Sequence, residues 1–153
     1  MSDRRRAKKR RVADVMVADV VTIEASASLI TAARRMGDAN VGMLPVVDRG
    51  RVVGVLTDRD LVVRGMAREV DPDATRVSEC MSDRVIPAHP DWPTERAIVT
   101  MAQAQVGRLP VLDDDERLVG VVTLSSMAFR SRHKAVALEA AQEVSRRSAR
   151  EAA

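Results

Sequence analysis

An internal repeat constrains this chain more than any other feature of its sequence. Residues 15–61 align with residues 80–127 at an offset of 65, which becomes 66 after one inserted residue in the second copy. The matched positions include Met16 with Met81, Val41–Asp48 with Val106–Asp113, and Gly54–Thr57 with Gly120–Thr123. A solenoid needs at least three stacked repeats to bury a continuous core, so two copies predict paired units with clefts between them.

Each copy predicts the order strand, helix, strand, strand, helix. A short extended piece, at 20–23 or 85–88, leads into an amphipathic helix. The expected helix starts are Ser26 or Ser28 in the first copy and Asp91 with Pro93 in the second. The expected buried faces are Leu29, Ala33 and Met36 in the first helix and Ala97, Met101 and Ala104 in the second.

A hairpin and a second helix complete each copy. Asp48–Arg51 separates two apolar runs and has the residues of a hairpin turn, and the acidic segment 113–116 takes the same place in the second copy. The second helices are expected from Asp58 and from Ser125 onward. We predict an α/β (α+β) fold in which the two repeats pack as a pseudo-two-fold pair.

The expected organisation has five parts. They are a basic disordered tail at 1–11, a first repeat at 12–68, a linker at 69–76, a second repeat at 77–129 and a helical extension at 130–153. We expect the extension to continue the last helix, either against a second subunit or into solvent. A chain of 153 residues is long enough for one well-packed domain without disulfides, and Cys80, the single cysteine, is expected inside the core.

Charge is distributed unevenly along the chain. Residues 4–11 hold seven basic groups, whereas residues 12–129 hold 12 arginines against 18 acidic groups. This acidic middle argues against a nucleic-acid-binding face built into the fold, and a single Phe, a single Trp and no Tyr argue against base stacking. The segment from Arg4 to Arg11 is either a solubilising arm or a nonspecific contact to a polyanion such as nucleic acid, an anionic membrane or an acidic protein.

Catalysis has little support in the sequence. His89 and His133 have no partner at catalytic or metal-ligand spacing, and the run Asp113–Glu116 reads as a solvated turn. A phosphate loop of the Walker type is absent from the sequence. We therefore expect no enzyme, no metal site and no required cofactor. Because no uncharged run reaches 18 residues, we also expect no transmembrane segment and a cytoplasmic protein.

The repeated segments resemble the CBS domain family, named for cystathionine beta-synthase, and in particular a tandem pair called a Bateman module. The resemblance rests on Val41-Gly-Met-Leu-Pro-Val-Val-Asp48 with Gly54-Val-Leu-Thr-Asp-Arg-Asp60, and on Val106-Gly-Arg-Leu-Pro-Val-Leu-Asp113 with Gly120-Val-Val-Thr123. It implies a sensor that binds AMP, ADP, ATP, S-adenosylmethionine or a related adenosyl ligand between the repeats. It also implies a homodimer of four repeats, of undetermined orientation.

The resemblance implies a site around three signature residues, Gly54, Thr57 and Asp60, which match the family's ribose-phosphate pattern in full. The remaining implied ligand contacts are Thr22, Ile23, Met43, Leu44, Pro45 and, for phosphate, Arg108, with Arg59 and Arg64 as weaker candidates. Thr57 and Asp60 also fit a capping box, which satisfies the first main-chain donors of a helix. The four residues from Thr57 to Asp60 alone favour the cap, whereas the repeat context favours a ligand site.

The second copy departs from the signature because Ser126 stands where the first copy has Asp60. A serine carries no charge and reaches less far toward a ribose. The weaker second site consists of Ala88, Leu109, Pro110, Thr123 and Ser126. A different class of function stays open beside the sensor: a dimerisation platform whose basic arm does the binding and which takes no nucleotide.

Overall fold

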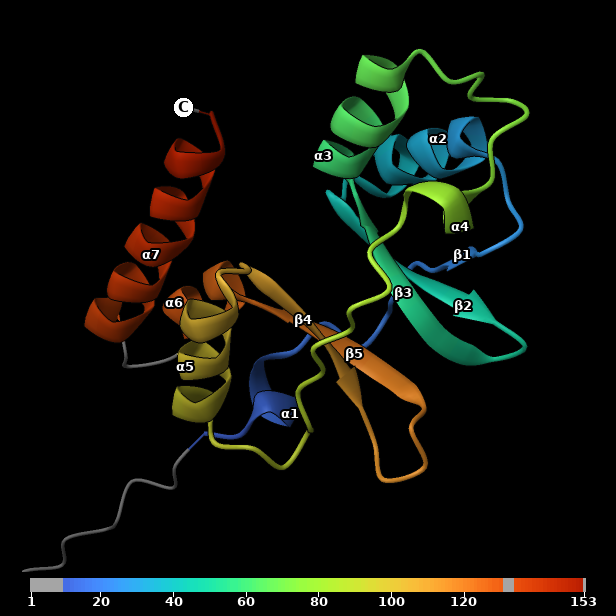
Figure 1. Cartoon of the computed structure of the whole chain (residues 1–153). Coiled ribbons are helices and arrows are strands. Elements are labelled where there is room, and N and C mark those ends of the chain that lie inside the picture. The colour runs from blue at the N-terminus through green and yellow to red at the C-terminus, as the bar shows by residue number, and fades with distance from the viewer. Residues whose placement is uncertain (1–9, 131–133, 153) are drawn as a thin grey trace, which may run out of the picture. The chain divides into compact units, whose positions relative to one another are not determined.

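The computed structural model describes residues 10–130 and 134–152, and in it the chain forms two compact units (Figure 1). The first-repeat unit consists of residues 19–86 together with 114–118. The second-repeat unit consists of residues 10–18, 87–113 and the described residues from 119 onward. Helices and strands are mixed in the chain, which confirms the predicted α+β class.

A three-stranded sheet and helix α2 form the body of the first-repeat unit. The sheet contains β1 (Ile23–Glu24), β2 (Met43–Asp48) and β3 (Arg51–Thr57), in that order. β1 pairs parallel to β2, and β2 pairs antiparallel to β3. In the turn between β2 and β3, Arg49 and Gly50 have φ values of 49° and 78°, the backbone that a two-residue hairpin turn requires. The predicted hairpin is therefore confirmed.

Helix α2 (Leu29–Ala39) starts at Ser28, whose Oγ accepts a hydrogen bond from the N–H of Thr31, as one of the two predicted starts requires. The buried face of α2 consists of Leu29, Ala32 and Met36. The prediction that Ala33 lies on this face is wrong, because Ala33 is exposed and its neighbour Ala32 is buried. The buried face of α2 is therefore centred on Ala32, whereas the spacing of apolar residues predicted a face that includes Ala33.

The segment predicted as one helix from Asp58 onward contains three helical geometries. It begins as α3 (Asp58–Asp60), widens into the π-helical turn η1 (Leu61–Gly65) and tightens into the 3₁₀ turn η2 (Met66–Arg68). The chain then returns through residues 69–76 to a short helix, α4 (Val77–Cys80). Val77 and Cys80 are buried in the same core cluster as Ile23, Leu44 and Leu56.

The second-repeat unit repeats this plan with a smaller sheet. Its elements are α1 (Val12–Val15), α5 (Thr94–Ala104), β4 (Arg108–Leu112), β5 (Leu118–Thr123), α6 (Leu124–Arg130) and α7 (Lys134–Ala152). The extended piece predicted at 85–88 contains no strand, and only Ala88 forms a parallel bridge, to Val111. On α5, Ala97 and Met101 are buried as predicted, whereas Ala104 is half-buried.

Helix α7 packs on α5 and α6 of its own chain. Ala140 is buried, and Gln105 Nε2 donates to Glu143 Oε1 at 3.3 Å. This packing within the chain was not among the expected surroundings, and contact of the segment with a second subunit stays a prediction. Within residues 10–130 and 134–152, neither α7 nor a shorter helix has an apolar stretch able to cross a bilayer.

The segment that opens each sequence repeat packs in the unit of the other repeat. Val17, just after α1, bridges to Val121 in β5, and Ser82, just after α4, bridges to Val55 in β3. Arg10 and Arg11, predicted as the end of a disordered tail, are bonded in the second-repeat unit: the Arg10 carbonyl accepts from the N–H of Thr94, and Arg11 pairs with Asp91 at 2.7 Å. Residues 1–9 of the predicted tail, and His133, lie outside the described residues.

Candidate functional site

Thr57 and Asp60 form a complete capping box where β3 meets α3. The N–H of Asp60 donates to Thr57 Oγ1 at 3.2 Å. Asp60 Oδ2 in turn accepts both the main-chain N–H and the hydroxyl of Thr57, each at 2.9 Å. The capping interpretation is therefore realised in the structure, and it uses one carboxylate oxygen of Asp60.

The second copy builds the same cap without a charge. The N–H of Ser126 donates to Thr123 Oγ1 at 3.0 Å, and the N–H of Thr123 donates to Ser126 Oγ at 3.1 Å. The Ser126 hydroxyl also donates to the Thr123 carbonyl at 2.9 Å. A hydroxyl is thus sufficient for this cap, so capping alone does not account for a carboxylate at Asp60.

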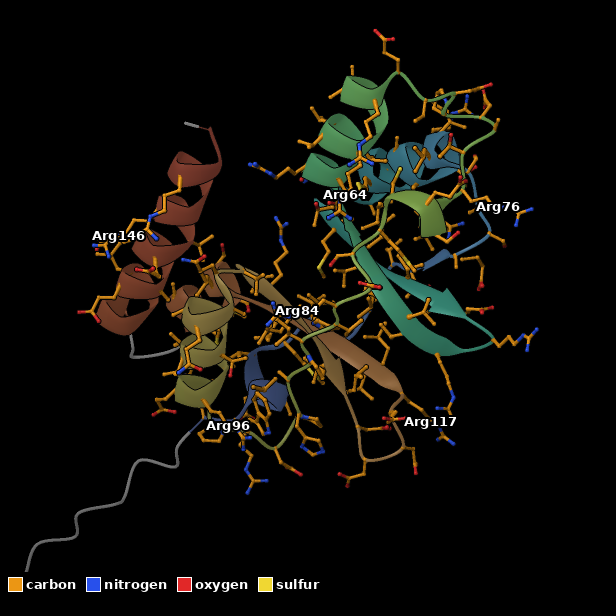
Figure 2. All side chains as sticks on the ribbon, in the orientation of Figure 1. Arg64, Arg76, Arg84, Arg96, Arg117 and Arg146 are labelled. Atoms are coloured by element: carbon orange, nitrogen blue, oxygen red, sulfur yellow. The ribbon has the colours of Figure 1, made fainter. Side chains whose placement is uncertain are left out.

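The other oxygen of Asp60 faces Arg64, one turn further along the chain. Arg64 Nε lies 3.7 Å from Asp60 Oδ1, and Arg64 Nη1 donates to the main-chain carbonyls of Cys80 and Met81 at 3.2 and 2.9 Å. Figure 2 labels Arg64 beside the helical segment that begins with α3. Arg64, a weaker candidate for phosphate, therefore already has three oxygen partners, whereas Arg59 is exposed.

Met43 lies opposite the cap in the hairpin. In the hairpin register Met43 pairs with Thr57, and the N–H of Asp58 donates to the carbonyl of Gly42 at 3.1 Å. The other predicted apolar contacts, Ile23, Leu44 and Pro45, are buried in the sheet. Met43 is itself buried, at 8% exposure, and Ile23 and Leu44 form part of the core.

Gly54, the first residue of the signature, is required by close packing. A Cβ atom at this position would lie 2.6 Å from Sδ of Met81 and 2.7 Å from the carbonyl oxygen of Ser82. Gly120 has the same requirement, because a Cβ atom there would lie 2.6 Å from Sδ of Met16. Since the second copy needs its glycine without a full signature, packing is a sufficient reason for Gly54.

The carbonyl of Thr22, predicted to hold adenine, accepts a hydrogen bond of 2.7 Å from Arg35 Nη1. Sequence reasoning missed Arg35, since an arginine on the polar face of an amphipathic helix carries no signal of such a bond. An open cavity of about 470 Å³ lies beside α2, lined by Val21, Thr31, Arg34, Arg35, Asp38 and Ala39. Its lining shares no residue with the predicted site.

The remaining predicted residues belong to the second-repeat unit. The residues predicted for a weaker second site are Ala88, Leu109, Pro110, Thr123 and Ser126, and the N–H of Ala88 donates to the Pro110 carbonyl at 2.8 Å. Arg108 begins β4 and is exposed. Because Arg108 and Asp60 are in different units, a joint role at one ligand stays a prediction.

Cys80 is 3% exposed, which confirms its predicted place in the core. Burial raises the pKa of its thiol above the usual value, the charge of Glu79 adds to this effect, and Arg68 and Arg64 oppose it. His89 lies in the loop before α5, where its Nδ1 accepts the N–H of Asp91 at 3.2 Å. The described residues contain no group of three side chains able to hold a metal ion.

The chain is similar to known proteins over most of its length. A model of the CBS domain matches residues 12–66 and 77–131. CBS domain-containing protein YhcV of Bacillus subtilis is 40% identical over 117 residues, which are 76% of this chain and 82% of YhcV. Hypoxic response protein 1 of Mycobacterium tuberculosis is 34% identical over 116 residues, 75% of this chain and 80% of that protein. The solved CBS domain pair of protein MJ0100, in complex with 5′-methylthioadenosine and S-adenosyl-L-methionine, has a TM-score of 0.72 at 29% identity and covers 79% of this chain and 94% of its own.

Proposed function

We propose that this chain, which belongs to the CBS domain family, is a regulatory module that binds an adenosyl ligand through the carboxylate of Asp60. The observation that carries the proposal is the difference between the two caps. Ser126 completes its cap with a hydroxyl, whereas Asp60 completes the same cap with Oδ2 and keeps a second oxygen beyond it. The cap does not need this negative charge. The charge pairs with Arg64, and we assign to it a role in recognising a ligand as well.

A ribose supplies the chemistry that fits this oxygen. Its two hydroxyls are hydrogen-bond donors, and an ionised carboxylate is an acceptor with capacity for several donors. Hydrogen bonds to a charged group contribute more than neutral ones. Met43, which is opposite Thr57 in the hairpin and 8% exposed, is the proposed apolar contact next to the cap. We assign Asp60 to the ribose and the Met43 side of the cap to the base.

The solved relative MJ0100 supports an adenosyl ligand. Its CBS domain pair was crystallised with 5′-methylthioadenosine and S-adenosyl-L-methionine, which share an adenosine group. These two compounds are therefore the first probes for this chain, and AMP, ADP and ATP are the comparators.

We also propose that the chain forms a homodimer through the apolar face of the second helical segment of the first-repeat unit. Val62, Val63 and Met66 in this segment are 54%, 48% and 75% exposed. Neighbouring apolar side chains exposed to this degree are typical of a surface that another protein covers. A second copy is the simplest partner, since most soluble oligomers are symmetric assemblies of one chain.

Calorimetry on the full chain tests the ligand proposal. The probes are 5′-methylthioadenosine, S-adenosylmethionine, AMP, ADP and ATP, with GMP as the control for the base. Saturable binding of one adenosyl compound, accompanied by a rise in melting temperature, is the expected result, because a ligand that binds only the folded state stabilises it. If none of them binds, the regulatory site is not at Asp60, and the dimerisation platform with its basic arm becomes the better description.

A further inference from the structure

We propose that Arg64 is a positioning residue that couples the state of the Asp60 carboxylate to the segment Cys80–Ser82. This segment ends α4 and leads toward residue 87, where the chain enters the second-repeat unit. The ligand-dependent part of the proposal rests on the proposed function of Asp60. The coupling itself is a property of the protein without ligand.

Arg64 contacts both ends of this connection. Its Nε lies 3.7 Å from Asp60 Oδ1, and its Nη1 donates to the carbonyls of Cys80 and Met81. Its own main-chain carbonyl accepts the thiol of Cys80 at a sulfur–oxygen distance of 3.6 Å. A guanidinium has five donors in a rigid plane, so one arginine can hold a carboxylate and two carbonyls together.

The segment Cys80–Ser82 also contacts the strand that ends at the cap. Ser82 and Val55 exchange two main-chain hydrogen bonds of 2.9 Å, and Met81 packs against Gly54. β3 continues from these residues directly to Thr57. The segment is therefore attached to the site twice, through β3 on one side and through Arg64 on the other.

The backbone around Arg64 is also unusual. Leu61–Gly65 forms a π-helical turn directly after Asp60, and such turns are rare and concentrate at functional positions. When ribose hydroxyls donate to Asp60, the carboxylate is held by the ligand as well as by Thr57, so it moves less and Arg64 moves less with it. The ligand thereby favours the state in which Cys80–Ser82 stays docked, as differential affinity for two states requires.

Hydrogen exchange at the amides of Met81 and Ser82 tests the coupling in the full chain without ligand. The variants are Asp60→Asn, Arg64→Met and the double variant, with Arg68→Met as the control. Arg68 places another positive charge near Cys80, whereas the bonds to the carbonyls of Cys80 and Met81 come from Arg64. We expect each of the two single variants to speed exchange about threefold, the double variant to be no faster than Arg64→Met, and the control to match the wild type. Additive effects of the two changes, or no effect of either, would overturn the proposal.

A ligand arm then separates this proposal from the proposed function. Saturating 5′-methylthioadenosine is expected to slow exchange at Met81 and Ser82 about fivefold in the wild type, and to leave it unchanged in Arg64→Met although calorimetry shows the compound bound. Full protection in Arg64→Met would refute the role of Arg64 while leaving the ligand site intact. If calorimetry shows no binding to the wild type, the ligand site is wrong, and the ligand-free cycle alone decides the coupling.

Arg64→Lys is the second variant in case Arg64→Met does not fold. Lysine keeps the positive charge, but a single ammonium group cannot reproduce the planar fork of arginine. The expected result is the same non-additivity with Asp60→Asn. Cys80, the single cysteine of the chain, offers a separate readout. We expect the variants that speed hydrogen exchange at Met81 and Ser82 to speed alkylation of Cys80 by iodoacetamide as well, in the same order. If the alkylation rates do not follow the exchange rates, the segment Cys80–Ser82 is not released in these variants, and the proposal is wrong.

Discussion

Asp60 and Ser126 occupy the same place in two N-terminal caps: Asp60 Oδ2 accepts the N–H of Thr57 at 2.9 Å, and Ser126 Oγ accepts the N–H of Thr123 at 3.1 Å. The protein therefore contains its own control for the two interpretations of the signature. What the two caps share is explained by helix initiation. What differs between them is one negative charge, which lies beside Arg64, is proposed to recognise the ligand, and can be changed without removing the cap.

Replacing Asp60 with serine is the sharpest test of the ligand site. Because Ser126 shows that a hydroxyl completes this cap, we expect Asp60→Ser to lower the free energy of unfolding by less than about 1 kcal/mol. Adenosyl binding measured by calorimetry should weaken at least about tenfold, since a charged acceptor is lost. Asp60→Ala, which also removes the acceptor for the Thr57 N–H, is expected to be less stable than Asp60→Ser. Unchanged affinity in Asp60→Ser would exclude Asp60 from the site.

The converse change should strengthen the second copy. Ser126→Asp restores the charge that the signature has at Asp60, and the aspartate can still accept the N–H of Thr123. We expect the cap to survive and the number of adenosyl ligands bound per chain, measured by calorimetric titration, to rise above that of the wild type. Ser126→Asn is the uncharged control. An increase with asparagine as well would show that charge is not the determinant.

Alanine at Gly54 should destabilise the fold. The new methyl group would approach both a side chain and the main-chain carbonyl of Ser82, and overpacking of this kind costs about 1–3 kcal/mol. Gly37→Ala is the matched control, because a Cβ atom built at this position of α2 has no atom within 4 Å apart from its chain neighbours and the backbone of its own helix. We expect Gly37→Ala to be stabilising by about 0.5–1 kcal/mol in the same denaturant titration. Equal stabilities would mean that Met81 and Ser82 do not pack on Gly54.

The pKa of Cys80 makes stability depend on pH in the alkaline range. Its pKa is raised in the folded state by burial, whereas an unfolded thiol ionises near pH 8.5. Below that pH the thiol is protonated in both states and has no effect. Above it only the unfolded state loses its proton, so the free energy of unfolding falls, by at most about 1.4 kcal/mol per pH unit, until the pH passes the raised pKa. Cys80→Ala should lack this fall, and identical pH profiles would show that the thiol is not buried.

Lysine at Met66 tests the proposed dimer surface. Met66 is the most exposed of the large apolar residues on η1 and η2, so a charge there would have to be buried in the dimer, at a large cost. We expect Met66→Lys to shift sedimentation from dimer to monomer without changing the melting of the monomer. Val99→Lys, on α5 and about as exposed as Val63, should remain dimeric. Dissociation by Val99→Lys alone would place the interface on α5 instead.

The sequence by itself determined the repeat, the order of elements and the hairpin turn. These are local properties: Arg49-Gly50 suits a two-residue turn wherever it stands, and Ser28 caps a helix by bonding to residues beside it. The pattern Thr57-x-x-Asp60 also predicted its own cap, because all of the bonds lie within four residues. The exact face of α2 was missed because Ala32 and Ala33 are equally apolar, and only the packing partners distinguish them.

Only the tertiary structure decided which copy each segment joins. Met16 and Met81 hold equivalent positions in the two repeats, yet Met16 packs on Gly120 and Met81 packs on Gly54, so each lies against the hairpin of the other sequence copy. The two copies have nearly the same sequence pattern, and either glycine leaves the same space for either methionine. The pattern therefore cannot predict that each methionine packs on the glycine of the other copy. The partners of Arg64 are hidden for a related reason: two of them are main-chain carbonyls, which every residue has, and folding alone brings Cys80 and Met81 to this arginine.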